Sequence, residues 1–242
     1  INSRVVLALD LDMKSASVLL RQSLEMLEST SEHICAVKIN RQLAIPIGLY
    51  GGVEKVVSLA HRLDMPAIMD AKINDVGHTN RAIAEHCFNV GFDAVTASPF
   101  IGWTDGLEPV FQLARENEKG VLLLVYMSHR GSEEGYGQMV IDRGTGGHRL
   151  QFEVFAEKAV EWDADGAIVG ATFPENISLA HKILGKKVPI YSPGVGAQGG
   201  EIETAIKSGT RYLIVGRTIY EADSPAEAAA RLKNAARRAE EH

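Results

Sequence analysis

The amino-acid sequence predicts an α/β fold, a single-domain (βα)8 barrel of the TIM type. Eight short apolar runs alternate with amphipathic helical stretches from one end of the chain to the other, which is the order of elements in such a barrel. The chain has 242 residues, of which 45% are hydrophobic, so it can bury one large core. No change of composition and no linker rich in proline or serine divides residues 1–242, so we expect one domain.

The expected strands are short runs rich in apolar and β-branched residues. In chain order they are Val5–Leu9, Ile34–Ile39, Ala67–Ala71, Ala94–Ala97, Val121–Tyr126, Ala167–Val169, Val188–Tyr191 and Tyr212–Val215. The expected helices have apolar residues at spacings of three and four. They are Ser15–Glu28, Gly52–Arg62, Thr79–Asn89, Gly106–Glu116, Gln151–Trp162, Glu175–Leu184, Glu201–Lys207 and an alanine-rich closing helix, Pro225–Glu241.

Composition and charge exclude several classes of function. The formal net charge is -6, the pI is near 5.8, and lysines and arginines are scattered, which argues against a nucleic-acid or anionic-membrane surface. No apolar run approaches the roughly 20 residues of a membrane span, and no signal peptide is expected. Cys35 and Cys87 lack metal-site spacing, so reduced thiols are favoured over a disulfide or a nucleophile. We therefore expect a cytoplasmic protein.

One connection is much longer than the others. Residues 128–147 contain six glycines, several charged residues and few apolar ones, and they follow the fifth expected strand. A loop of this length in a compact domain is usually functional or disordered, and it leaves the barrel at the end where active sites form. We predict a mobile lid at 128–147, with a passive insertion as the alternative.

The most informative segment is Met69–Asp75, where two acids and a lysine follow an apolar run. Successive side chains of a strand point to opposite faces, so Asp70 and Lys72 are expected on the same face, roughly 7 Å apart. Burying opposite charges side by side costs several kcal/mol per ion, which only good geometry offsets. Such a pair at a strand end therefore indicates a site more than a core.

Polar residues also lie at or near the carboxyl ends of other expected strands, where (βα)8 enzymes place their chemistry. They are Asp10, Lys38, Ser128 with His129, Ser192 to Gly194, and Gly216 with Arg217. Singly they have simpler explanations: Asp10 as a turn residue, Lys38 as a lysine extending to the rim, Asp75 as a helix cap, and Ser128 as a loop residue. His129 and His148 lack partners at metal-ligand spacing, so they are expected to be surface residues. Together, however, the charged residues form an alternating array that independent causes would rarely assemble.

A glycine-rich loop, Pro193–Gly200, follows the seventh expected strand. It contains G-x-G-x-x-G, but in a dinucleotide-binding site this motif follows the first strand of an open sheet, and the next strand carries an acidic residue. In (βα)8 barrels the loops after strands seven and eight often bind phosphate. Gln198 could donate through its amide and Arg217 could form a bidentate contact. The alternative is that the glycines serve only tight turns.

Taken together, these segments resemble the orotidine 5′-phosphate decarboxylases, in particular their compact archaeal-type branch. The matching segments are Val5–Asp10, Val37–Lys38, Asp70–Asp75 with Thr79 and Asn80, Met127–His129, Ser192–Gly200 and Val215–Tyr220. They extend over nearly the whole chain. The D-x-K-x-x-D and P-G-V-G-A-Q-G-G elements are each specific and occur in the expected order.

The resemblance implies decarboxylation of orotidine 5′-monophosphate to uridine 5′-monophosphate in pyrimidine biosynthesis, with no metal or cofactor. The catalytic residues it implies are Lys72, Asp70, Asp75 and Lys38, with Lys72 stabilising and then protonating a carbanion at C6. The substrate-binding residues it implies are Asp10, Lys38, Thr79, Ser128, Pro193, Gly194, Gln198, Gly199, Gly216, Arg217 and Tyr220. It also implies a homodimer in which Asp75 and Thr79 reach the partner's site.

The chain departs from the family pattern at two positions. Gly77 and Arg130 stand where the family usually has proline, which bears on the placement of Thr79 and on the shape of the lid. Two rival functions remain open: a magnesium-dependent sugar-phosphate decarboxylase or aldolase with the same D-x-K-x-x-D element, and a nucleotide-binding protein without chemistry. The first needs a further acid that is not evident after the first four strands. The second gives no reason to bury Asp70 beside Lys72.

Overall fold

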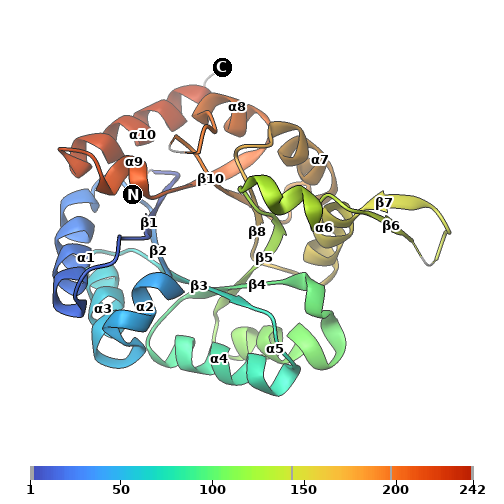
Figure 1. Cartoon of the computed structure of the whole chain (residues 1–242), viewed down its shortest axis with the longest axis horizontal. Helices are drawn as coiled ribbons and strands as arrows, with labels where there is room; N and C mark the ends of the chain where they lie inside the picture. Colours follow the sequence, from blue (N-terminus) through green and yellow to red (C-terminus); the bar gives the residue numbers. More distant parts are fainter. Residues whose placement is uncertain (1–2, 143, 197, 241–242) are drawn as a thin grey trace.

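The computed structural model describes residues 3–142, 144–196 and 198–240, and within them eight parallel strands close into a barrel surrounded by helices (Figure 1). In barrel order the strands are β1 (Val5–Leu9), β2 (Ala36–Asn40), β3 (Ala67–Ile73), β4 (Ala94–Ala97), β5 (Gly120–Tyr126), β8 (Gly166–Val169), β9 (Ile190–Pro193) and β10 (Thr210–Val215), which pairs with β1. All eight predicted strands are present, so the predicted (βα)8 fold is confirmed. Strand boundaries differ by up to two residues: β2 and β9 begin two residues later than expected, and β10 begins two residues earlier.

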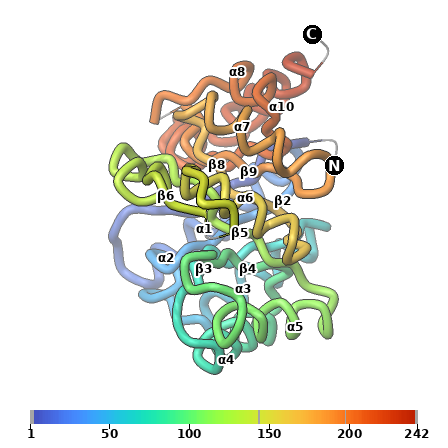
Figure 2. Tube along the Cα trace, turned by 90° about the vertical axis from the view of Figure 1, so that its right-hand side faces the viewer, coloured from blue at the N-terminus to red at the C-terminus, as the bar shows by residue number. Residues whose placement is uncertain are grey.

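The helices that surround the barrel come between its strands in the sequence, and the last two follow the last strand. They are α1 (Ala16–Thr30), α2 (Arg41–Ile47), α3 (Glu54–Arg62), α4 (Gly77–Asn89), α5 (Glu108–Glu116), α6 (Gln151–Glu161), α7 (Pro174–Leu184), α8 (Ile202–Lys207), α9 (Arg217–Tyr220) and α10 (Pro225–Glu240). The side view in Figure 2 shows α4 and α5 at one end of the ring and α8 and α10 at the other. No single helix of the described part is long and apolar enough to cross a membrane; the pair Arg41–Ile47 and Leu49–Arg62, bent by 98°, has the length and composition of a span only when the two are taken together.

Two helices are absent from the sequence prediction. In α2, Pro46 argues against a helix because proline lacks an N–H, yet the helix forms and ends one residue later at Ile47, with Gly48 as its C-cap. Its first turn is capped by Asn40, whose side-chain oxygen accepts the N–H of Leu43 at 3.2 Å. The other helix, α9, has only four residues and follows Gly216 directly.

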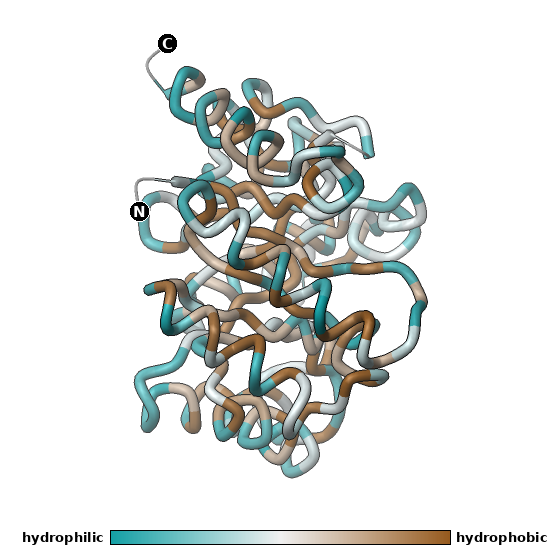
Figure 3. Tube along the Cα trace, turned by 90° about the vertical axis from the view of Figure 1, so that its left-hand side faces the viewer, coloured by the Kyte–Doolittle hydropathy of each residue, from teal (hydrophilic) through white to brown (hydrophobic). Residues whose placement is uncertain are grey.

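The barrel core is divided by strand alternation into an inner and an outer layer. Val5, Leu7 and Leu9 pack outward against the helices, whereas Val6 and Ala8 pack inside the barrel. The other inner residues are Ala36, Ile68, Ala94, Leu122, Leu124, Ile168 and Ile214. In Figure 3, hydrophobic segments lie toward the centre of the molecule and hydrophilic residues are frequent on its outer turns. Apolar packing thus fills the barrel up to the level at which the polar strand ends begin.

The segment predicted as a lid contains regular structure. Residues Arg130–Glu134 form a 3₁₀ helix, and β6 (Met139–Ile141) pairs antiparallel with β7 (His148–Leu150) in a hairpin that projects beyond the ring of helices (Figure 1). Asp142 accepts the N–H of Gly144 at 2.8 Å and so orders the turn. Arg143, within the predicted lid, lies outside the described residues. Whether this segment moves stays a prediction.

We predict that Gly166→Ala destabilises the barrel, because no space exists for a methyl group inside β8. A Cβ at Gly166 would lie 2.6 Å from Cε2 of Tyr191 and 3.2 Å from Cγ of Leu122. Overpacking of this kind costs about 1–3 kcal/mol of unfolding free energy. Urea unfolding at fixed protein concentration measures this loss. Gly135→Ala is the matched control, because a Cβ there meets nothing within 4 Å; an equal loss in both variants would contradict the prediction.

Candidate active site

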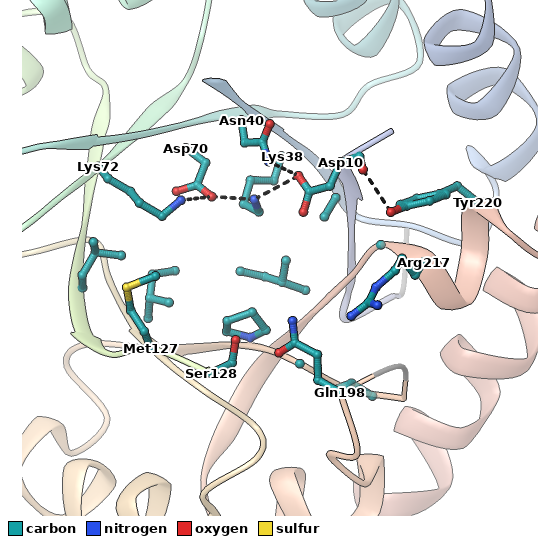
Figure 4. Close-up of a pocket in the computed structure, with 18 residues that line it drawn as sticks. Asp10, Lys38, Asn40, Asp70, Lys72, Met127, Ser128, Gln198, Arg217 and Tyr220 are labelled. Carbon is teal, nitrogen blue, oxygen red and sulfur yellow. Dashed lines mark hydrogen bonds and ion pairs between the residues drawn. The ribbon is translucent and has the colours of Figure 1, made fainter. Parts of the chain in front are cut away.

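A cavity of about 240 Å³ opens at the carboxyl ends of the barrel strands (Figure 4). The predicted site residues that line it are Asp10, Lys38, Asp70, Lys72, Ser128, Pro193, Gly194, Gln198, Gly216, Arg217 and Tyr220. It is also lined by Ala8, Asn40, Leu124, Met127, Ile168, Val195 and Ile214. The fold therefore assembles, in one place, polar residues from strands that lie far apart in the sequence.

Strand alternation explains why these side chains meet. The inward-facing row of β1 continues from Val6 and Ala8 to Asp10, and the neighbouring rows become polar at Lys38 on β2 and Asp70 on β3. Because β2 pairs in parallel with both β1 and β3, the polar ends of these rows are adjacent. The charged wall of the cavity is thus the continuation of the apolar barrel core.

Asp70 lies between two lysines at the centre of this wall. Its Oδ2 atom is 2.7 Å from Nζ of Lys38 and 2.7 Å from Nζ of Lys72 (Figure 4). Nζ of Lys38 is also 3.7 Å from Oδ1 of Asp10. Lys38 and Asp70 are only 5% and 8% exposed. The predicted alternating array therefore exists as a chain of ion pairs that is largely withdrawn from water.

The ion pairs keep these groups charged despite burial. Burial alone raises the pKa of Asp70, but the ammonium groups of Lys38 and Lys72 outweigh it and hold that pKa well below its usual range. Burial alone lowers the pKa of Lys38, but the carboxylates of Asp70 and Asp10 raise it above its ordinary value. Both groups are consequently ionised at neutral pH.

Lys72 is held in an unusual backbone conformation. Its φ is 47°, in the left-handed region that costs a non-glycine residue about 1–2 kcal/mol. The pairing of β3 with β4 shifts register between Met69 and Ile73, so Lys72 lies in an irregularity of the sheet. Its backbone N–H donates to Oγ1 of Thr96 at 3.0 Å. Strain of this kind persists only where the surroundings fix it, and it is concentrated at functional sites.

Two polar residues that contact the array, Asn40 and Thr96, are not among those predicted from the sequence. Nδ2 of Asn40 donates to Oδ1 of Asp10 at 2.6 Å, and Oγ1 of Thr96 donates to Oδ1 of Asp70 at 2.8 Å. Alternation could have identified Asn40, because it follows Lys38 by two residues on the same inward row. Thr96 carries no such signal, since threonine is common in strands.

The glycine-rich loop and α9 form the opposite, open side of the cavity. Gln198 and Arg217 are exposed, and in Figure 4 their polar groups extend into the space facing the charged wall. Gly194 has φ 96°, and a Cβ there would lie 2.8 Å from Oε1 of Gln198. This loop therefore requires glycine next to the donor it presents. Ala197 of the loop lies outside the described residues, and Gly199, also with positive φ, does not line the cavity.

Tyr220 closes the cavity beside Asp10. Its hydroxyl donates to the backbone oxygen of Asp10 at 2.9 Å (Figure 4). Burial, reinforced by the carboxylate of Asp10, raises the pKa of Tyr220 to about 12, so the phenol stays neutral. Its hydroxyl is thus fixed as a donor at the rim.

Asp75 and Thr79 lie outside this cavity. Asp75 is exposed and accepts the N–H of Val76 at 2.7 Å, and α4 begins at Gly77, so Asp75 is not its N-cap. Instead Asp75 lines a second hollow of about 840 Å³, which Lys72 also lines. A Cβ at Gly77 would lie 2.9 Å from the backbone oxygen of Asp105, which explains glycine at this departure from the family pattern.

Among the described residues, the two cysteines are not thiolates and the acidic side chains form no metal-binding group. Cys35 and Cys87 are free, and burial raises their pKa values to about 11 and about 12, so neither is a thiolate at neutral pH. Within the part of the chain that the structure describes, no group of three His, Cys, Asp or Glu side chains could hold a metal ion.

The sequence is similar over nearly its whole length to one family of known proteins. The model of the orotidine 5′-phosphate decarboxylase / HUMPS family matches residues 3–232. The chain belongs to this family. Orotidine 5′-phosphate decarboxylases from Methanosarcina barkeri and Thermococcus kodakarensis are 37% and 36% identical to it, each over 95% of this chain and over 93% and 95% of their own length. The family predicted from the sequence is therefore confirmed.

Solved structures of the orotidine 5′-phosphate decarboxylase family have the same fold. The enzyme from Methanocaldococcus jannaschii, in complex with the inhibitor BMP, superposes with a TM-score of 0.80 at 26% identity, covering 96% of this chain and 97% of its own. The enzyme from Pyrococcus horikoshii gives 0.75 at 30% identity, covering 96% and 99%. The likeness thus spans both chains almost completely.

We predict that Asp70 stabilises the fold in a pH-dependent way. Because its folded pKa lies below the ordinary value of 3.8, ionised Asp70 contributes stability above that pH, and the contribution is lost as the pH falls toward the folded pKa. At neutral pH the free energy of unfolding of the wild type should exceed that of Asp70→Asn by about 3 kcal/mol, because the variant leaves two lysines without their carboxylate.

Urea unfolding of both proteins at several pH values checks this expectation. The difference should be constant from about pH 7 to 5 and should shrink below about pH 4. A difference that stays constant throughout, or that grows on acidification, would contradict it. Because both proteins share every other titrating group, general acid unfolding cancels in the comparison.

Proposed function

We propose that the chain decarboxylates orotidine 5′-monophosphate to uridine 5′-monophosphate in pyrimidine biosynthesis, without metal or cofactor. The observation that carries the proposal is the buried Lys38–Asp70–Lys72 array lining the cavity, in a chain whose curated relatives are named for this activity. A cytoplasmic location belongs to the same proposal.

Lys72 acts on the reacting carbon. As the bond between C6 and the carboxylate breaks, carbon dioxide leaves and the electron pair stays on C6. The ammonium of Lys72 stabilises this charge and then gives a proton to C6, which yields the product and a neutral lysine that regains its proton from water. Lys72 suits this role because it lines the cavity and its Nζ is paired with the carboxylate of Asp70, which remains ionised.

Asp70 faces the substrate carboxylate. Its low pKa keeps it anionic, so the bound substrate places a second negative charge beside it, and departure of carbon dioxide relieves the repulsion. The apolar side chains of Leu124, Ile168 and Ile214 line the same cavity, and their low polarity strengthens each electrostatic contact.

The remaining lining residues bind the nucleotide. Asp10, oriented by Asn40, and Lys38 hold the ribose hydroxyls, and Ser128 contacts the pyrimidine. Gln198, Arg217 and the N–H of Gly216 bind the phosphate, and Pro193, Gly194 and Tyr220 shape that side. Gly199, which does not line the cavity, gives the loop after Gln198 its turn through its positive φ. Binding energy at the phosphate, far from the breaking bond, closes the segment 128–147 and orients the base.

The active unit is a homodimer in which Asp75 and Thr79 complete the partner's site. Support comes from the surface around the second hollow, which is lined in part by Ile45 and Ile83. The side chains of Ile45, Ile83, Tyr50 and Val76 are apolar and exposed, as is typical of a surface that another chain covers. Because Lys72 borders both hollows, a chain seated on this surface would approach Lys72 from outside.

The central prediction is that turnover requires Lys72 and no metal. Purified protein with orotidine 5′-monophosphate and excess EDTA should show loss of substrate absorbance, and Lys72→Ala should lower kcat by about a thousandfold or more. Lys187→Ala is the control, since Lys187 pairs with Asp163 on the surface. No turnover in EDTA, with magnesium-dependent turnover of a keto-sugar phosphate, would favour the rival enzyme class; binding of nucleotide without turnover would favour a binding protein.

The composite site predicts complementation between two inactive variants. Lys72→Ala and Asp75→Asn homodimers should each be nearly inactive. In a mixed dimer one site receives both substitutions and the other neither. Random reassembly of equal amounts should therefore restore about one quarter of the wild-type activity. Activity that stays at the level of the separate variants, with mixed dimers shown by native mass spectrometry, would rule out a site shared between chains.

A further inference from the structure

Thr96 lies in the middle of β4, fully buried, and it does not line the cavity. Its side chain nevertheless touches both residues on which the proposed reaction depends. Oγ1 of Thr96 donates to Oδ1 of Asp70 at 2.8 Å and accepts the backbone N–H of Lys72 at 3.0 Å. Because a backbone N–H can only donate, the single hydroxyl proton is directed to Asp70. The directions of both hydrogen bonds are therefore fixed.

The contact with Asp70 completes the surroundings of the carboxylate. Oδ2 faces Nζ of Lys38 and of Lys72, each at 2.7 Å, so Oδ1 is left to Thr96. With separate partners on its two oxygens, the carboxylate has one favoured orientation. Without the hydroxyl it could rotate and draw either lysine from its place.

The contact with Lys72 acts on the backbone. Register between β3 and β4 is interrupted between Met69 and Ile73, and the N–H of Lys72 is bound by the Thr96 side chain at that point. The residue there has φ 47°, which L-residues with side chains rarely adopt. The hydroxyl thus gives this N–H a buried acceptor in the conformation that aims Nζ into the cavity.

We propose that Thr96 is a positioning residue: its hydroxyl fixes the Asp70 carboxylate and the Lys72 backbone together, and so sets the geometry of proton transfer to the substrate. The inference rests on the proposed decarboxylation. It assigns to β4, which supplies no cavity-lining residue among the described ones, a role in the reaction through its neighbour β3.

The test compares Thr96→Val, which keeps the shape and removes the hydroxyl, with Thr96→Ser, which keeps the hydroxyl. Thr210→Val is the matched control. Thr210 is also a buried threonine on a barrel strand, bound to Ser192 at 2.7 Å, but it begins β10 at the end away from the cavity. For each protein we would measure kcat and KM for orotidine 5′-monophosphate, the Kd of uridine 5′-monophosphate by calorimetry, and the thermal midpoint.

Thr96→Val should lower kcat roughly ten- to a hundredfold, the range for losing one hydrogen bond to a charged group. KM and the Kd of the product should change by no more than about twofold, because Thr96 does not touch the ligand. Thr96→Ser should recover most of kcat. Thr210→Val should have the kcat of the wild type, even if its thermal midpoint is lower. If Thr96→Val does not fold, Thr96→Cys serves instead, since a thiol is a weak donor and should show the same loss of kcat.

Three results would overturn the inference: unchanged kcat in the variant without the hydroxyl, equal loss in Thr96→Ser, or equal loss in Thr210→Val. Its failure is distinct from failure of the proposed function. If the wild type does not turn over orotidine 5′-monophosphate, both the proposed function and the role of Thr96 are contradicted. If the wild type is active and Thr96→Val is equally active, only the role of Thr96 is contradicted.

Discussion

The site depends on one interaction, the carboxylate of Asp70 held between the ammonium groups of Lys38 and Lys72. Removing three charges from water costs several kcal/mol per ion, and attraction in the interior offsets that cost only when geometry is good and remaining hydrogen-bonding atoms are satisfied. Both conditions are met here, since Oδ2 has two cations and Oδ1 has a hydroxyl. Each carboxylate oxygen is bound before any substrate arrives, so the array is preorganised and need not reorganise during the reaction.

The barrel makes that interaction possible by dividing each strand into two functions. The inner rows are apolar over most of their length, with Val6, Ala36 and Ile68 packed across the barrel, and become polar only at the carboxyl ends. The apolar part supplies stability through burial, and the polar part is carried on its rigid end. Because the two parts share strands, any shift in register would move both at once.

This division also explains what the sequence could predict. A period of two places Asp70 and Lys72 on one face, and alternation of strands and helices fixes the order of elements, so the fold and the charged wall follow from local pattern alone. Three features do not. The left-handed backbone of Lys72 and its bond to Thr96 depend on how β3 meets β4, the α2 helix forms despite Pro46, and the hairpin within 128–147 is hidden by glycines that also suit an irregular loop.

Lys72 is the least sheltered member of the array. Its side chain is 28% exposed, against 7% for Lys38 and 10% for Asp70, and it borders both the cavity and the second hollow. Electrostatic stabilisation of a carbanion is greatest where water is excluded. In the proposed homodimer, the chain that covers the exposed apolar side chains around the second hollow also removes water from Lys72. Assembly would then do more than supply Asp75 and Thr79: in the proposed reaction it would also strengthen the field of Lys72, which gives a physical reason for a single barrel to leave this lysine partly open.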